Sequence, residues 1–230
     1  MAAYCLLHGN WHDAESWEPL IVALLARGHD AVAPDLPIDD PEAGWDERVA
    51  SAMAALQGIE GTVVVVVHSA TSGVGALLSS QLDDPLLVYL CPRLGHLQPP
   101  PDAPEPFRPG FPFPPRRPDG ASVWDRDAAI AAMYGRLPRE TAEALADRLR
   151  PAAPPRGGYP LTGNPKVATA LVYASEDEFF EPEWERLMAR EVLGVEPIEL
   201  SGGHFPMLED PERLAGVLDR LARRHDERRR

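Results

Sequence analysis

Several patterns that define other classes of protein are scarce or missing in this chain. Its two cysteines, Cys5 and Cys91, lie in apolar segments without metal-site spacing, so we expect two buried thiols and no metal site. No apolar run approaches the roughly 20 residues that cross a bilayer. Met1 leads almost directly into an apolar segment, which leaves no room for the basic and apolar parts of a signal peptide. These absences predict a cytoplasmic protein that does not contact membranes.

Basic residues are also in short supply. The chain has 22 lysines and arginines against 36 aspartates and glutamates, which gives a formal net charge of −14. Such a field repels nucleic acid and anionic membrane surfaces, and this favours a neutral or small-molecule partner. No glycine-rich phosphate loop or dinucleotide fingerprint occurs, so we expect no organic cofactor. No sequence pattern indicates an oligomeric state.

The regular pattern that is present alternates short apolar runs with amphipathic segments. Expected strands cover residues 4–8, 31–33, 62–67, 86–91, 167–173 and 197–200. Expected helices cover residues 17–27, 46–57, 72–81, 127–134, 139–149, 183–191 and 211–223. Near-continuous apolar strands are typical of a parallel sheet covered on both faces. The pattern predicts an α/β fold, with one domain over residues 1–230 and an open, mostly parallel, doubly wound sheet of about six strands.

Two proline-rich segments interrupt this alternation. Residues 92–118 contain 11 of the 26 prolines, so neither a helix nor a central strand is expected there. Residues 151–165 are rich in proline and glycine, and two short expected helices lie between the two segments. Because another strand follows, we expect residues 92–165 to form a proline-rich helical cap above the sheet, and long insertions of this kind are usually functional.

A candidate nucleophile follows the most apolar expected strand. Residues 63–67 are all valine, and Ser69 comes directly after them, before a helix rich in small residues. A strand, a sharp turn and a helix with serine at the apex form a nucleophile elbow, which exposes the hydroxyl above the strand end. Serine is also a common cap of a helix N-terminus. From this segment alone the two interpretations have about equal weight.

Candidates for a base and an acid follow the last two expected strands. His204 comes after the paired glycines 202–203 on a strand-to-helix loop, where the glycines let the imidazole turn back over the sheet. Asp177 lies on the loop after the preceding strand, with Glu176 and Glu178 as neighbouring rivals. A base oriented by an acid activates a serine nucleophile. We expect Ser69, His204 and Asp177 to meet at one edge of the sheet.

Backbone groups and aromatic side chains are candidates for the rest of the site. The N–H groups of Asn10 and Ala70 are the expected oxyanion donors, since Gly9 permits close approach of the backbone. The residues expected to line the substrate pocket are Gly9, Trp11, Trp124, Tyr134 and Phe205. The aromatic members of this set fit an ordinary core of the cap equally well.

The sequence resembles the α/β-hydrolase superfamily over nearly its whole length, apart from the proline-rich insertion. The matching segments are Leu6-Leu7-His8-Gly9 with Trp17 downstream, Ala33-Pro34-Asp35-Leu36-Pro37, the elbow around Ser69, Glu176-Asp177-Glu178-Phe179-Phe180 and Gly202-Gly203-His204. Within the superfamily the chain is most similar to the small esterase and hydroxynitrile-lyase branch. The resemblance implies a triad in the order nucleophile, acid, base, which is the order found here.

The chain also departs from the family pattern. The family elbow is usually G-x-S-x-G, whereas Val67 and Thr71 stand here in place of the glycines. Either the turn is relaxed, or neighbouring elements make room for it. Hydroxynitrile lyases of this branch typically carry Thr and Lys where this chain has Gly9 and Phe205, which disfavours lyase chemistry. The family's leading antiparallel hairpin is missing, in keeping with about six strands.

These features predict a cofactor-free serine hydrolase, a carboxylesterase that cleaves a small hydrophobic or aromatic ester through an acyl-enzyme. Two alternatives stay open. One is a weakly active or inactive ligand-binding homologue, which Val67 and Thr71 motivate. The other is a lyase or cyclase of specialised metabolism that uses His204 as an acid and base.

Overall fold

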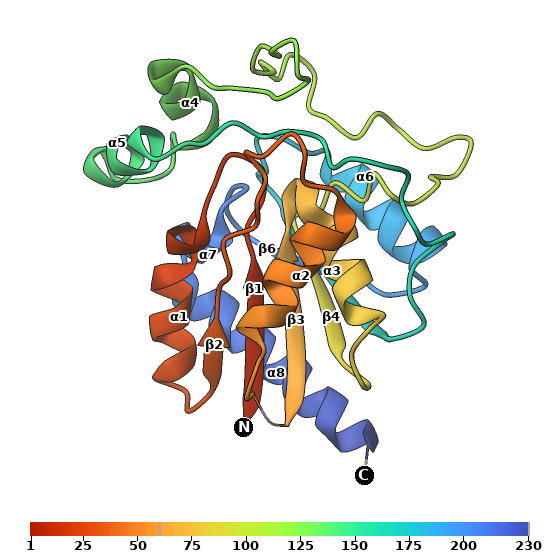
Figure 1. Ribbon diagram of the computed structural model, residues 1–230. Coiled ribbons are helices and arrows are strands. Elements are labelled where there is room, and N and C mark those ends of the chain that lie inside the picture. The colour runs from red at the N-terminus through yellow and green to blue at the C-terminus, as the bar shows by residue number, and fades with distance from the viewer. Residues whose placement is uncertain (60, 230) are drawn as a thin grey trace.

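Six parallel strands form the centre of the computed structural model, which describes residues 1–59 and 61–229 (Figure 1). The strand order is β2-β1-β3-β4-β5-β6, and each neighbouring pair is parallel. The strands are β1 (Ala2–Leu7), β2 (Asp30–Val32), β3 (Thr62–His68), β4 (Leu86–Leu90), β5 (Ala168–Ala174) and β6 (Ile198–Leu200). The prediction of an open, mostly parallel sheet of about six strands is confirmed.

The helices fill the connections between strands. They are α1 (Glu18–Leu25), α2 (Trp45–Ala55), α3 (Ser72–Ser79), α4 (Arg126–Met133), α5 (Arg139–Asp147), α6 (Pro182–Leu187), α7 (Pro206–Glu209) and α8 (Pro211–Arg229). Short helical turns are η1 (Ala14–Trp17), η2 (Ser69–Thr71) and η3 (Met188–Val192). The segment expected as one helix over residues 183–191 changes to a π-helical turn at Met188.

Alternate side chains of each strand face the two sides of the sheet. On β1, Tyr4 and Leu6 join the core under α1 and α8, whereas Cys5 and Leu7 join the core under α2, α3 and α6. Every residue of β1 and β4 is buried, because helices cover both faces. Cys91, which follows β4, is separated from Cys5 by strand β3, and both are buried free thiols as expected.

The carboxyl ends of all six strands meet at one edge of the sheet, since the strands are parallel. Ser69 follows β3, Asp177 follows β5 and His204 follows β6. The loop with Asn10 follows β1, which pairs with β3 over its whole length. Ligands of open α/β sheets bind outside this edge. The topology therefore brings the expected site residues to the same side of the molecule.

The chain between β4 and β5 passes over this edge, with α4 and α5 lying beyond the ends of the strands (Figure 1). Isolated β-bridges join it to the rest of the chain, from Phe107 to Phe180 and from Arg156 to Gly44. A third bridge, between Ser122 and Ala152, connects its two proline-rich segments. Within the described part of the chain, no helix has both the length and the apolar character needed to cross a membrane.

Candidate active site

Ser69 occupies a sharp turn between β3 and α3. Its φ of 57° lies in the left-handed region, which residues with a side chain adopt rarely and at a cost. The Ser72 hydroxyl donates a hydrogen bond to the Ser69 carbonyl at 2.5 Å, and the Thr71 hydroxyl donates one to the His8 carbonyl at 2.7 Å. The turn at Ser69 is therefore strained and held in place by its neighbours.

Two glycines outside the elbow make room for its bulkier residues. A Cβ placed on Gly75, one helical turn along α3, would lie 2.5 Å from Val67 Cγ1. A Cβ placed on Gly9 would lie 2.9 Å from His68 Nδ1 and 3.1 Å from Ser69 Cβ. A neighbouring element thus accommodates Val67, one of the two side chains that replace the usual glycines, in keeping with one of the two outcomes expected from the sequence.

Ser69, His204 and Asp177 form a continuous chain of hydrogen bonds. The Ser69 Oγ lies 3.0 Å from His204 Nε2, and His204 Nδ1 lies 2.6 Å from Asp177 Oδ2. The second carboxylate oxygen, Asp177 Oδ1, accepts hydrogen bonds from the N–H groups of Phe179 and Phe180 at 2.7 and 2.9 Å. All three side chains are buried, with Ser69 the most accessible at 7% exposure. This geometry matches a nucleophile, a base and the acid that orients it.

The other two candidate carboxylates, those of Glu176 and Glu178, form hydrogen bonds with groups other than the His204 ring. Glu176 and Glu178 both accept hydrogen bonds from Arg136, at 2.5 and 3.0 Å. Glu178 also accepts a hydrogen bond from the backbone N–H of His204 at 2.9 Å, and burial raises the pKa of its carboxyl. Among these three neighbours, Asp177 alone contacts the imidazole ring, while Glu178 holds the backbone that carries it.

The paired glycines before His204 have a steric role. Gly202 has a φ of 121°, a conformation that favours glycine. A Cβ on Gly203 would lie 2.6 Å from both carboxylate oxygens of Glu178. The N–H of Gly203 donates to Glu209 at 2.9 Å. The chain therefore needs glycine here to bring the backbone of His204 against the two glutamates.

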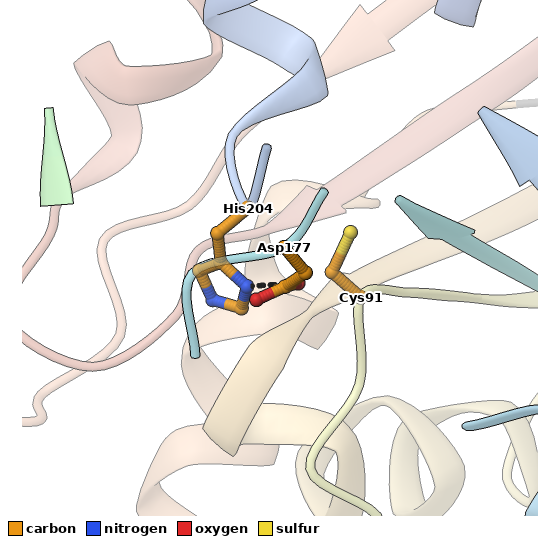
Figure 2. Close-up of side chains that lie close together, drawn as sticks. All are labelled: Cys91, Asp177 and His204. Carbon is orange, nitrogen blue, oxygen red and sulfur yellow. Dashed lines mark hydrogen bonds and ion pairs between the residues drawn. The ribbon is translucent and has the colours of Figure 1, made fainter. Parts of the chain in front are cut away.

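Cys91 lies beside Asp177 and His204 (Figure 2), and one potential ligand atom from each of the three residues falls within 4.8 Å of the others. Burial raises the pKa of the Cys91 thiol well above its usual range, and the Asp177 charge acts in the same direction. Metals bind the thiolate, which these surroundings disfavour. Both nitrogens of His204 already have hydrogen-bond partners. The chemistry of these donors fits a proton relay better than a metal site.

Two buried histidines shape the loop after β1. The His8 Nδ1 donates to the Gly9 carbonyl at 2.9 Å, and its Nε2 accepts from the Leu36 N–H at 2.9 Å. The His12 Nδ1 donates to the Asn10 carbonyl at 2.8 Å. Burial lowers the pKa of each imidazole to about 4, so both are neutral at pH 7. They fix the backbone around Asn10 without adding charge to the site.

Ser69 opens into a cavity of about 300 Å³ beneath the cap. The residues that line it are Asn10, Trp11, Ser69, Ala70, Arg93, Phe107, Phe111, Phe113, Pro114, Arg116, Ser122, Phe179 and Phe180. Asn10 and Ala70, the expected oxyanion donors, thus stand at the cavity beside the serine. Aromatic rings make up most of the remaining wall.

Of the five residues expected to line the pocket, Trp11 does so, and the other four lie behind the wall. Gly9 packs on Ser69, and Trp124 contacts Trp11 edge to face with ring centres 5.7 Å apart. Tyr134 and Phe205 are buried around His12, to which the Tyr134 hydroxyl donates a hydrogen bond at 2.7 Å. Their side chains turn into the core because His12 and the cap helices cover them.

The cavity wall instead comes from residues that the sequence pattern did not single out. Phe107, Phe111 and Phe113 belong to the first proline-rich segment, and Phe179 follows the acid loop. Phe179 stacks on the His204 imidazole with ring centres 4.2 Å apart. The signal that would have found the first three was the concentration of phenylalanine in a segment that forms neither helix nor strand.

A family model described as "Alpha/beta hydrolase family" matches residues 6–217. A search of curated proteins gave no match. The solved structures that resemble the chain include a pyrethroid hydrolase from Sphingobium faniae, with 21% identity, a TM-score of 0.76, and coverage of 96% of this chain and 98% of the other.

Two further structures resemble the chain over a similar extent. A methylesterase from Arabidopsis has 18% identity and a TM-score of 0.71, with coverage of 96% and 98% of the two chains. Polyneuridine aldehyde esterase has 16% identity and a TM-score of 0.73, with coverage of 96% and 99%. At these identities the likeness establishes the fold. Together with the family model, it shows that this chain belongs to the α/β-hydrolase family.

Proposed function

We propose that the protein is a serine hydrolase, a carboxylesterase that cleaves a small hydrophobic ester through an acyl-enzyme. One observation carries this proposal: the hydrogen-bonded chain from Ser69 through His204 to Asp177 ends at an aromatic cavity. Such a chain activates a serine hydroxyl for attack on a carbonyl.

The proposed first half of the reaction forms the acyl-enzyme. Ser69 Oγ attacks the ester carbonyl while His204 Nε2 takes the hydroxyl proton. Asp177 accepts the hydrogen bond from His204 Nδ1–H and stabilises the imidazolium that forms. The N–H groups of Asn10 and Ala70 hold the oxyanion. When the intermediate collapses, His204 returns the proton to the leaving alcohol.

The second half releases the acid. Water attacks the acyl carbonyl as His204 Nε2 takes one of its protons, and that proton passes to Ser69 Oγ when the acyl–oxygen bond breaks. The serine hydroxyl and the neutral imidazole are restored, and no cofactor takes part in the proposed cycle.

The cavity supports a small ester with apolar or aromatic parts. Its volume of about 300 Å³ is at the small end of ligand pockets. Three structurally similar proteins are named a pyrethroid hydrolase, a methylesterase and polyneuridine aldehyde esterase. We also propose that residues 92–165 act as the cap of a single domain, since Phe107, Phe111 and Arg116 from this segment line the cavity. Two free thiols suit a reducing compartment such as the cytoplasm.

Hydrolysis of short p-nitrophenyl esters tests this proposal. Ser69→Ala removes the nucleophile and should lower kcat/KM by about 10³-fold or more. Ser80→Ala, just after the end of α3, is the matched control and should keep turnover. Turnover by Ser69→Ala at the wild-type rate would overturn the proposal and favour the lyase or cyclase alternative, in which His204 acts without the serine.

A further inference from the structure

We propose that the cavity selects an ester whose apolar skeleton also carries a free carboxylate, held by Arg93 and Arg116. This inference rests on the proposed function and deepens it, because it names the class of ester. The half-esters of small dicarboxylic acids are the simplest members of that class.

Both arginines line the cavity into which Ser69 opens. The backbone N–H of Arg93 donates to the Ser69 carbonyl at 3.1 Å, which fixes Arg93 beside the nucleophile. Its guanidinium carbon lies over the ring of Phe107, 5.7 Å from the ring centre, so the charged group is placed against the aromatic wall. Arg116 comes from the cap, and its Nη1 donates to the Gly120 carbonyl at 2.8 Å.

Neither guanidinium has a carboxylate partner within 4.0 Å among residues 1–59 and 61–229. At least 11 other arginines form ion pairs, while several others, such as Arg117 and Arg220, also have no carboxylate partner among these residues. The described lining of the cavity includes no aspartate or glutamate. The two positive charges at the cavity are therefore uncompensated by the protein.

The two arginines also affect each other. Burial lowers the pKa of Arg93, although part of its side chain reaches solvent, and the charge of Arg116 lowers it further. Both residues are exposed, so solvent screens much of the repulsion between the two charges, and only a small cost of bringing them together remains. An anion between them would relieve this cost, and a guanidinium binds a carboxylate through paired N–H···O bonds.

The two arginines at the cavity contrast with the overall charge of the molecule, which is negative. A net charge of −14 repels anions at long range, so nothing but contacts at short range would recognise a carboxylate here. With the ester carbonyl at Ser69 Oγ, the rest of the substrate would occupy the cavity that Phe111, Phe179 and the two arginines line. The carboxylate binds and orients the substrate but takes no part in bond breaking.

A pair of matched substrates tests the inference. Mono-p-nitrophenyl glutarate carries a free carboxylate, and its methyl ester has nearly the same shape without the charge. We expect the wild-type ratio of kcat/KM, charged over neutral, to exceed one. It should fall by about 10- to 100-fold in Arg93→Gln or Arg116→Gln, because a charge-assisted hydrogen-bonded pair is lost.

Arg117→Gln is the control, since it removes the same charge from the exposed residue next to Arg116 and should leave the ratio within twofold of wild type. Because Arg93 touches the elbow, thermal unfolding of each variant is measured alongside, and Arg116→Gln gives an independent result from the cap. An unchanged ratio in the Arg93→Gln, Arg116→Gln double variant would overturn the inference.

Binding to the Ser69→Ala variant separates this inference from the proposed function. Calorimetry with the uncleaved charged and neutral esters measures recognition without turnover. If both esters are hydrolysed by the wild type but bind the variant equally well, the carboxylate site is wrong and the esterase stands. If neither is hydrolysed yet the charged ester binds at least 10-fold more tightly, with loss of that preference in Arg93→Gln, the carboxylate site stands and the esterase does not.

Discussion

Gly75 packs directly against Val67, so that a Cβ on the glycine would lie 2.5 Å from Val67 Cγ1 and 2.6 Å from Val67 Cβ. The valine precedes the elbow of Ser69 and occupies a place where the family usually has glycine. In the family pattern the glycines of the elbow itself leave room for the sharp turn. Here Gly75 of α3 leaves the room that Val67 needs. This packing accommodates Val67, one of the two residues that motivate the inactive-homologue alternative.

Gly75→Ala is expected to lower the free energy of unfolding by about 1–3 kcal/mol, because the added methyl overlaps a buried side chain. The cost should shrink in a Val67→Gly background, where the Cβ and both methyl groups are absent, so a double-mutant cycle by urea denaturation measures the contact. Gly216→Ala in α8 is the control, since a Cβ there meets nothing closer than 3.6 Å. Equal costs of Gly75→Ala in both backgrounds would contradict this account.

Asp177→Asn is expected to lower kcat by about 10³- to 10⁴-fold while the fold is kept, because an amide does not hold the imidazole in the required tautomer or stabilise its cation. Glu176→Gln makes the same type of change one residue away, at a side chain bound to Arg136, and should change kcat by less than threefold. Steady-state hydrolysis of a p-nitrophenyl ester gives both values. The reverse order of effects would assign the acid to Glu176.

Stability should fall in mild acid because of the buried histidines. His8 and His12 have pKa values of about 4 when folded, below their usual value of 6.5, so the unfolded chain binds more protons between these limits. The contribution of these histidines to the free energy of unfolding is therefore fully present above pH 6.5 and is lost as the pH falls towards 4. The loss is about 2 kcal/mol per histidine between pH 7 and pH 5. Urea denaturation at pH 7, 6 and 5 measures this slope, and His12→Gln should make it shallower. A slope that His12→Gln leaves unchanged would show that this imidazole is not buried and neutral.

Glu185 is expected to reduce stability at neutral pH. It is fully buried, and neither carboxyl oxygen has a hydrogen-bond partner in the described part of the chain. Burial raises the pKa of this carboxyl well above its usual 4.5, and the charge of Asp177 acts in the same direction. As the pH rises past 4.5, the unfolded chain releases a proton that the folded chain keeps, so stability falls.

Glu185→Leu should accordingly raise the free energy of unfolding at pH 7 by about 1–3 kcal/mol, and the gain should shrink as the pH is lowered to 4. The exposed Glu183 lies on the same helix, and Glu183→Leu should give a change near zero. Chemical denaturation at both pH values makes the comparison. A lower stability of Glu185→Leu at pH 7 would mean that the carboxylate has a compensating partner.

The sheet was the part of the fold most open to prediction from the sequence. Residues 63–67 are an unbroken run of valine, and such a run fits a strand that is covered on both faces. The alternation of apolar runs and amphipathic segments then predicted that the strands of the sheet are mostly parallel. Most element ends differ from the predicted ones by one or two residues, whereas α8 continues past its predicted end at residue 223 as far as Arg229. Hydrogen bonds at helix ends depend on contacts far away in the chain, as where α6 continues into a π-helical turn at Met188.

The meeting of Ser69, Asp177 and His204 also followed from position, since each comes directly after a parallel strand. The choice of Asp177 over its neighbours Glu176 and Glu178 could not be settled in this way. It depends on side-chain direction, and the contacts with Arg136 draw both glutamates away from the imidazole ring.

The pocket wall was not predictable from periodicity. The proline-rich segment has no repeating pattern, so nothing indicated which of its residues turn inward. Trp124 and Tyr134, expected as apolar walls of the cap, pack behind the wall, whereas Phe107 and Phe111 face the cavity. For the same reason, the sequence did not indicate that Arg93 and Arg116 line the cavity. Their position there depends on how the cap folds over the serine.

Covalent labelling tests the central claim most directly. The wild-type protein is treated with a fluorophosphonate probe, digested and analysed by mass spectrometry, in parallel with Ser69→Ala and Asp177→Asn. The account predicts one adduct, on the peptide that contains Ser69, with none in Ser69→Ala and much slower labelling in Asp177→Asn. A wild-type protein that remains unlabelled, or an adduct on another residue that persists in Ser69→Ala, would contradict it.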